Sequence, residues 1–183
     1  MKLQLYLILI MFLTFSYSFG QKSPYKKNLE PLKFIEGTFT NKISFPDDNK
    51  GWRKPIETRF IFKKIMKDMY IEGGGHIPFD SKFSPIFRMT FDYDEQNDIY
   101  RLVVLDDRYG FMDIYYGNWK ENQLILSNET TGTQVVNEGN RVYGKLIITP
   151  LSKGRFEIIA KISQDKKTSW QNYMKMEFVP RTK

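Results

Sequence analysis

The feature that most constrains the fold is a two-residue alternation of apolar and polar side chains, which recurs along the chain from residue 37 onward. Near the C-terminus Phe156, Ile158, Ala160 and Ile162 occupy every second position, and most residues between them are polar or charged. Successive side chains of a β-strand point to opposite faces, so a period of two predicts a strand with one buried face. The sequence therefore predicts β-structure for most of the chain.

The alternating runs are separated by turn residues, such as those at 94–97 and 152–154. We expect strands at 37–44, 56–65, 69–73, 87–93, 100–105, 111–116, 123–127, 141–149, 156–163 and 170–180, with an optional strand at 131–136. Pro31 favours a short helical turn before the first strand. Because closure removes exposed edge strands, we predict an all-β, antiparallel up-and-down barrel of about 8–10 strands; a two-sheet sandwich is the alternative.

The N-terminus has the three parts of a secretory signal peptide. Lys2 precedes an apolar run, Leu3–Phe15, and the small residues Ser18 and Gly20 mark a cleavage site after Gly20. The apolar run is shorter than the roughly 20 residues of a bilayer span, so we expect no stable membrane span after cleavage. The predicted organisation is a signal peptide (1–20), a flexible lead-in (21–30) and one barrel domain (31–183) in a secreted or periplasmic protein.

Composition limits the chemistry. The chain has no Cys, which excludes disulfides, zinc–thiolate sites and a cysteine nucleophile. Its one histidine, His76, cannot build a His-rich metal site, so we predict no metal and no cofactor; an axial haem ligand is the alternative use of a lone imidazole. The net charge of +7 favours anionic partners. The charges are interleaved and export is expected, so we predict no nucleic-acid partner.

The candidate ligand-binding residues are His76, Phe79, Tyr100, Asp106 and Trp119. The first two lie in Gly74–Pro85, a predicted long loop that carries Pro78 and Pro85. Such loops often cover a binding site. The others combine aromatic surface with a polar group that can orient a ligand. We interpret the preceding triple glycine as a strand bend or bulge.

Two further patterns are less specific. Asp106, Asp107 and Asp113 lie close together around a predicted turn, where carboxylates could act in acid–base chemistry. Asn128 begins a glycosylation acceptor triplet, which matters only in a eukaryotic source.

Three stretches resemble an uncharacterised lipocalin-like (calycin) barrel family, a domain of unknown function. They are Leu32–Phe39; Phe91–Asp94 with Tyr100, Asp106 and Gly110; and Ser163–Asp165 with Trp170, Phe178 and Arg181. Phe39 stands where the family has a tryptophan. The resemblance implies a fold and no established activity, and it implies that Arg181 packs across Phe39.

Three functional hypotheses follow from the sequence. The first is a secreted barrel that binds a small apolar molecule in its lumen. The second is a barrel enzyme of the isomerase or cyclase type, with His76, Tyr100 and Asp106 as acid, base or orienting group. The third is an envelope or extracellular interaction protein without a ligand, which an exposed apolar patch would favour. No pattern indicates the oligomeric state.

Overall fold

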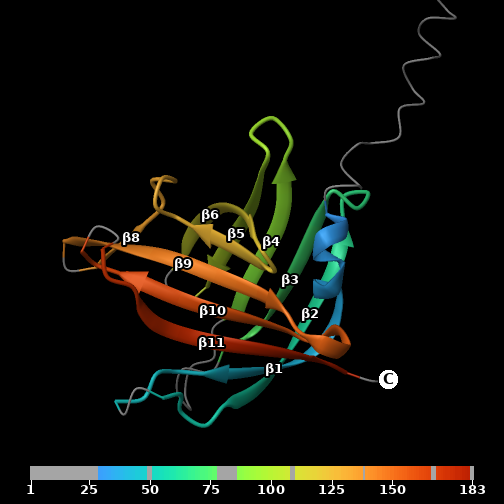
Figure 1. Ribbon diagram of the computed structural model, residues 1–183, viewed down its shortest axis with the longest axis horizontal. Helices are drawn as coiled ribbons and strands as arrows, with labels where there is room; N and C mark the ends of the chain where they lie inside the picture. Colours follow the sequence, from blue (N-terminus) through green and yellow to red (C-terminus); the bar gives the residue numbers. More distant parts are fainter. Residues whose placement is uncertain are drawn as a thin grey trace, which may run out of the picture.

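A computed structural model describes residues 29–48, 51–77, 86–107, 110–137, 139–165 and 168–181. The predicted signal peptide lies outside these residues, as does most of the predicted lead-in. Within them the chain forms one sheet of 11 strands and two 3-10 turns (Figure 1). In chain order the elements are η2 (Glu30–Ile35), β1 (Gly37–Ser44), β2 (Ile56–Ile65), β3 (Tyr70–His76), β4 (Ile86–Asp94), β5 (Ile99–Asp106), β6 (Phe111–Lys120), β7 (Gln123–Ser127), β8 (Val135–Asn137), β9 (Asn140–Pro150), η3 (Ser152–Gly154), β10 (Phe156–Ser163) and β11 (Gln171–Pro180).

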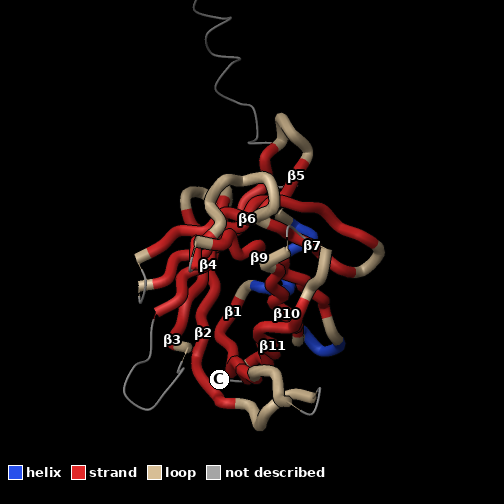
Figure 2. The backbone as a smooth tube through the Cα atoms, turned by 90° about the vertical axis from the view of Figure 1, so that its left-hand side faces the viewer, coloured by secondary structure: helices blue, strands red, loops and turns tan. Residues whose placement is uncertain are grey.

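The sheet closes into an antiparallel barrel. Sequential strands pair from β1 to β7, β7 pairs with β9, and β9 pairs with β10, which returns through β11 to β1. Figure 2 shows part of this order, with β3, β2, β1 and β11 following one another from left to right. Short β8 pairs only with β9, so ten strands close the barrel. The predicted all-β barrel with a helical turn is confirmed, and the two-sheet sandwich is wrong.

The observed strand bounds match the predicted ones at β1, β2, β7 and β10. Two strands extend beyond their predicted ends: β6 continues to Lys120 instead of ending at residue 116, and β3 continues through Gly74, Gly75 and His76 instead of ending at Gly73. The triple glycine is therefore part of a regular ladder with β2 and β4, and the predicted bend or bulge is absent there. The loop after β3 begins at Ile77, and residues 78–85 lie outside the described residues.

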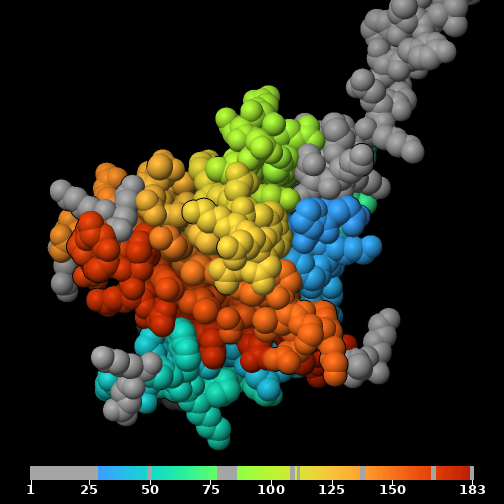
Figure 3. Space-filling view, in the orientation of Figure 1, coloured from blue at the N-terminus to red at the C-terminus, as the bar shows by residue number. Residues whose placement is uncertain are grey.

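The turn η2 covers one end of the barrel, which we call the proximal end. Its Leu32 and Ile35 are completely buried. The ring of Phe34 makes edge contacts with Trp119 of β6 and Phe156 of β10, at centroid distances of 6.4 and 5.6 Å. Figure 3 shows the same neighbourhood on the surface, where η2 (blue) adjoins the β6–β7 hairpin (yellow).

Phenylalanine rings fill the proximal half of the lumen. Phe156 and Phe178 stack at 4.3 Å, and Phe39 and Phe60 pack edge-on against them at 5.2 and 5.6 Å. All four rings are at most 2% exposed. Close-packed aromatic rings leave no room for a ligand, so this half of the barrel is structural core.

Candidate functional site

The half of the lumen opposite η2, which we call the distal lumen, is less tightly closed. Inward-facing Phe87 and Val104 of β4 and β5 are 9% and 8% exposed, and Leu146 and Ala160 of β9 and β10 are each 7% exposed. Nearer η2, Leu102 and Ile158 are at 0%, whereas Tyr100 of the proximal half is 7% exposed. These four side chains belong to the barrel core and keep a small residual exposure.

The slightly exposed inward-facing side chains of β9–β11 are neighbours in the strand register. Leu146 pairs with Ala160, and Ala160 pairs with Met174 of β11, which is 5% exposed, so these three side chains form one apolar strip. On β1 and next to β3, Ile43 and Ile77 are completely buried. In the distal lumen the side chains along β4–β5 and β9–β11 are therefore slightly more exposed than those along β1–β3.

A buried polar network borders this apolar surface. Asp113 of β6 is 3% exposed, and its two carboxylate oxygens accept hydrogen bonds from Asn128 Nδ2 at 2.8 Å and Thr133 Oγ1 at 2.7 Å. Asn128 Oδ1 also accepts the backbone N–H of Gly144 at 2.7 Å. The β7–β8 segment is therefore fastened to both β6 and β9 by the side chains of two residues.

Tyr115 joins the network from β6. Its hydroxyl lies so close to β9 that a Cβ added to Gly144 would come within 2.7 Å of it, so only glycine fits at that position. Burial, then the negative charge of Asp113 and a hydrogen bond with it, holds the pKa of Tyr115 well above its usual 10.0. Tyr115 is therefore a neutral phenol at physiological pH.

The predicted site residues separate into two groups. Tyr100 and Trp119 lie together in the proximal half, with ring centroids 6.5 Å apart, and burial raises the pKa of Tyr100. Asp106 is buried at the opposite end of the same strand, next to Phe87 in the register. Six residues of strand separate Tyr100 from Asp106 by about 20 Å. One cavity cannot use both residues.

The other two predicted residues do not extend either group. His76 is exposed and pairs with Ile86, whose side chain is also exposed, whereas the neighbouring pair Gly75 and Phe87 faces the lumen. The alternation therefore directs His76 to the outer face at the distal rim. Phe79 lies outside the described residues.

The structure bears on two further sequence-based statements, the packing of Arg181 across Phe39 and the acceptor triplet at Asn128. The backbone N–H of Arg181 donates to Thr38 O at 2.9 Å, so Arg181 continues the β11 register opposite Thr38, which lies on the other face of β1 from Phe39. The ring of Phe39 packs against Phe156 instead. Asn128 is 1% exposed with both amide atoms hydrogen bonded inside the fold. The folded chain cannot present Asn128 for glycosylation.

Neither a metal centre nor a spanning helix is found in the described part of the chain. No group of three or more His, Asp or Glu side chains there is placed to hold a metal ion. No helix among those residues is long and apolar enough to cross a membrane.

The barrel resembles a solved structure. Rv2717c from M. tuberculosis matches with a TM-score of 0.54 at 10% sequence identity, over 85% of this chain and 98% of that chain. This chain is similar in fold to Rv2717c. Identity this low shows the fold alone. No protein-family model matches the chain, and neither does any curated protein, so the calycin resemblance stays a prediction.

The sequence predicts only part of the distal lumen. The alternation correctly marks Phe87, Leu146 and Ala160 as inward-facing residues. It does not show at which height of the barrel each residue lies, because height depends on the register between strands. Asp113 was identified as one of three turn carboxylates, whereas its partners Asn128 and Thr133 follow it by 15 and 20 residues.

Proposed function

We propose that this protein binds a small, mostly apolar molecule in the distal lumen. The observation that carries the proposal is the residual exposure, 7–9%, of the inward-facing side chains Phe87, Val104, Leu146 and Ala160. Apolar surface that faces water inside a protein gains free energy when a ligand covers it, by about 25 cal/mol per Å². The filled proximal half limits the ligand to the outer part of the barrel.

The chemistry of the surrounding wall suggests what kind of ligand fits. The apolar strip of Leu146, Ala160 and Met174 lies near the Asp113–Tyr115 pair, because the Tyr115 hydroxyl would be 2.7 Å from a Cβ added to Gly144, two residues before Leu146. A mostly apolar molecule with one hydrogen-bonding group matches this combination, because ligand sites pair an apolar lining with few polar contacts.

We also propose that the protein acts outside the cytoplasm. The support is the basic residue, apolar run and small residues of segment 1–20. N-terminal sequencing of the protein purified from its own host tests this directly. A mature N-terminus at Gln21 is expected, and a retained Met1 or Lys2 would contradict export by cleavage.

Native mass spectrometry of protein purified from its own host tests ligand binding. We expect an added mass that disappears on denaturation and belongs to a small molecule. A protein that carries no added mass, and that gains none after incubation with a lipid extract of the host, would contradict the proposal.

The two alternatives have less support. The enzyme hypothesis needs His76, Tyr100 and Asp106 in one cavity, and they occupy the outer rim, the proximal half and the distal half of the barrel. The interaction hypothesis needs a continuous exposed apolar patch. Ile61, Leu105 and Met112 are exposed on one outer row, but Gly74 and charged Arg88 interrupt the row.

A further inference from the structure

A pocket lies on the outside of the barrel, lined by residues of β1, of β11 and of the segment that joins β1 to β2. Its volume is about 260 Å³. Four of its lining side chains are cationic and one is a carboxylate: Lys42, Arg53, Lys54, Lys175 and Glu177. Trp52 supplies an indole ring. This composition differs from that of the distal lumen, which is apolar.

Backbone hydrogen bonds hold the β1–β2 segment over the pocket. Pro46 and Trp52 form an isolated β-bridge, and the N–H of Arg53 donates to Phe45 O at 2.9 Å. The N–H of Asp47 donates to Gly51 O at 3.0 Å. These bonds fix the backbone that carries Trp52, so the pocket is a built feature of the fold.

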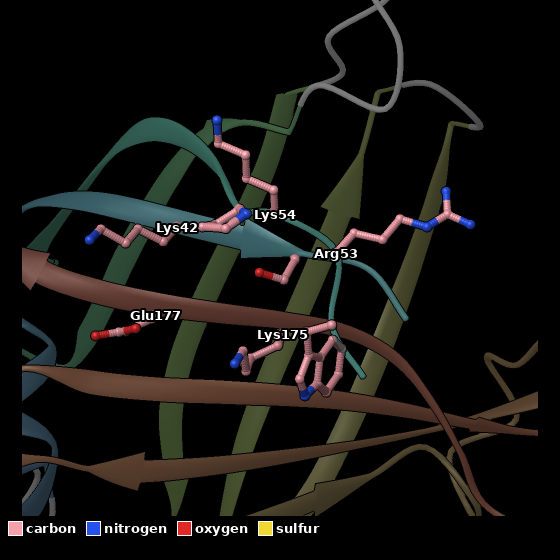
Figure 4. A pocket seen from close by; sticks show the side chains of 8 residues that line it. Lys42, Arg53, Lys54, Lys175 and Glu177 are labelled. Atoms are coloured by element: carbon pink, nitrogen blue, oxygen red, sulfur yellow. The ribbon is translucent and has the colours of Figure 1, made fainter. Parts of the chain in front are cut away.

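The strand register places the other lining residues. Lys42 of β1 pairs with Glu177 of β11, and Ser44 pairs with Lys175. Figure 4 shows Lys42 and Lys175 on neighbouring strands, while Arg53 and Lys54 extend in different directions. The Lys175 ammonium lies 5.2 Å from the centre of the Trp52 ring.

The pocket has more positive charge than its own carboxylate can balance. Glu177 is ion-paired with Arg155, and Lys42 Nζ is 3.9 Å from Glu57, at the outer limit of an ion pair. Arg53, Lys54 and Lys175 have no ion-pair partner among the described residues. Cations gathered in one concave site repel each other and attract an anion.

We propose that this outer pocket binds a phosphate group, or a similar oxyanion, that is attached to a small organic body. The lysines provide charge-assisted hydrogen bonds to the oxyanion, which lysine makes as a point charge. The face of Trp52 packs against the organic part. The site is independent of the lumen, because Lys42 lies on the outer face of β1 while its neighbours Asn41 and Ile43 are completely buried on the inner face.

The test uses the full mature chain and nuclear magnetic resonance titrations at constant ionic strength. The probes are inorganic phosphate, phenyl phosphate and phenol. We expect saturable shifts of the Trp52 indole N–H with both phosphates, with tighter binding of phenyl phosphate, and no saturable shift with phenol. Absence of saturation with either phosphate would overturn the proposal.

Two variants separate a specific site from diffuse charge. Lys42→Gln combined with Lys175→Gln should weaken phenyl phosphate binding at least about fivefold, because it removes two of the cations that contact the oxyanion. Lys63→Gln combined with Lys120→Gln is the matched control, since it removes the same number of charges and neither of these exposed lysines lines the pocket. Equal weakening in both proteins would contradict the proposal, because it would show that phenyl phosphate binding depends only on the net charge of the protein.

A third arm identifies the source of the phosphate. Vesicles of phosphatidylcholine with phosphatidylglycerol are sedimented with the protein. Binding that requires Lys42 and Lys175 and is displaced by phenyl phosphate assigns the pocket to a lipid headgroup. No sedimentation, together with saturable binding of phenyl phosphate, assigns it to a soluble phosphate compound.

Discussion

The ring of Phe62 on β2 lies directly on the backbone of Gly73, its partner on β3: a Cβ added to Gly73 would come within 1.9 Å of Phe62 Cδ1. The next pair repeats the arrangement, because a Cβ on Gly75 would lie 2.3 Å from Phe60 Cδ2. Glycine weakens a strand, and an aromatic ring across from it covers the exposed backbone. The glycines of β3 therefore make room for two rings of the core.

Gly73→Ala should lower the free energy of unfolding by about 2 kcal/mol, because the methyl group must displace the buried Phe62 ring. Chemical denaturation measures the change. Gly51→Ala is the control, since a Cβ there meets nothing within 4 Å. Equal stability of the Gly73→Ala protein and the wild type would show that the Phe62 ring moves away without cost.

The pairs of glycine and phenylalanine also show which features could not be predicted from the sequence. Alternation and turn residues predicted the strands, and strand number and spacing predicted the barrel. The three glycines looked like a bend because their partners Phe60 and Phe62 lie more than ten residues earlier in the chain. The same limit applies to Tyr100 and Asp106, which are both inward-facing on β5 but lie in different halves of the lumen.

The side-chain amide of Asn41 lies in the core. It is completely buried, and neither its Nδ2 nor its Oδ1 has a hydrogen-bond partner among the described residues; the same holds for Oγ1 of its strand partner Thr58. Asn41→Leu should therefore raise the free energy of unfolding by about 1–3 kcal/mol. Thermal and urea denaturation measure the change. A destabilised variant would show that the amide is hydrogen bonded in solution.

Asp113 should be the most sensitive residue of the polar network. Asp113→Ala leaves Asn128 Nδ2 and Thr133 Oγ1 without their acceptor and should lower the free energy of unfolding by about 2–3 kcal/mol. Replacing exposed Asp48 with Ala should change it by no more than about 0.5 kcal/mol. Comparable losses in the two variants, measured by urea denaturation, would contradict the assigned role of Asp113.

Tyr115 makes the fold sensitive to alkaline pH. Its pKa in the folded chain is well above 10.0, so as pH rises past that value the unfolded chain loses this proton first. The unfolded state then binds fewer protons than the folded state, and stability falls with rising pH. Tyr115→Phe should lose less stability than the wild type between about pH 9 and pH 11 in urea denaturation. Parallel curves for the two proteins would show that Tyr115 ionises normally in the folded state.

The most direct test of lumen binding compares two adjacent valines of β5. Val104 faces the distal lumen and Val103 faces outward, so the same substitution, Val104→Phe or Val103→Phe, fills the proposed site in one protein only. The measurement is a fluorescence titration with a neutral apolar dye such as Nile red, at a pH where both variants are folded. The account predicts saturable binding by the wild type and by Val103→Phe, weakened at least about tenfold in Val104→Phe, which corresponds to about 1.4 kcal/mol. Equal dye affinity in the two variants, or no saturable binding by the wild type, would contradict it.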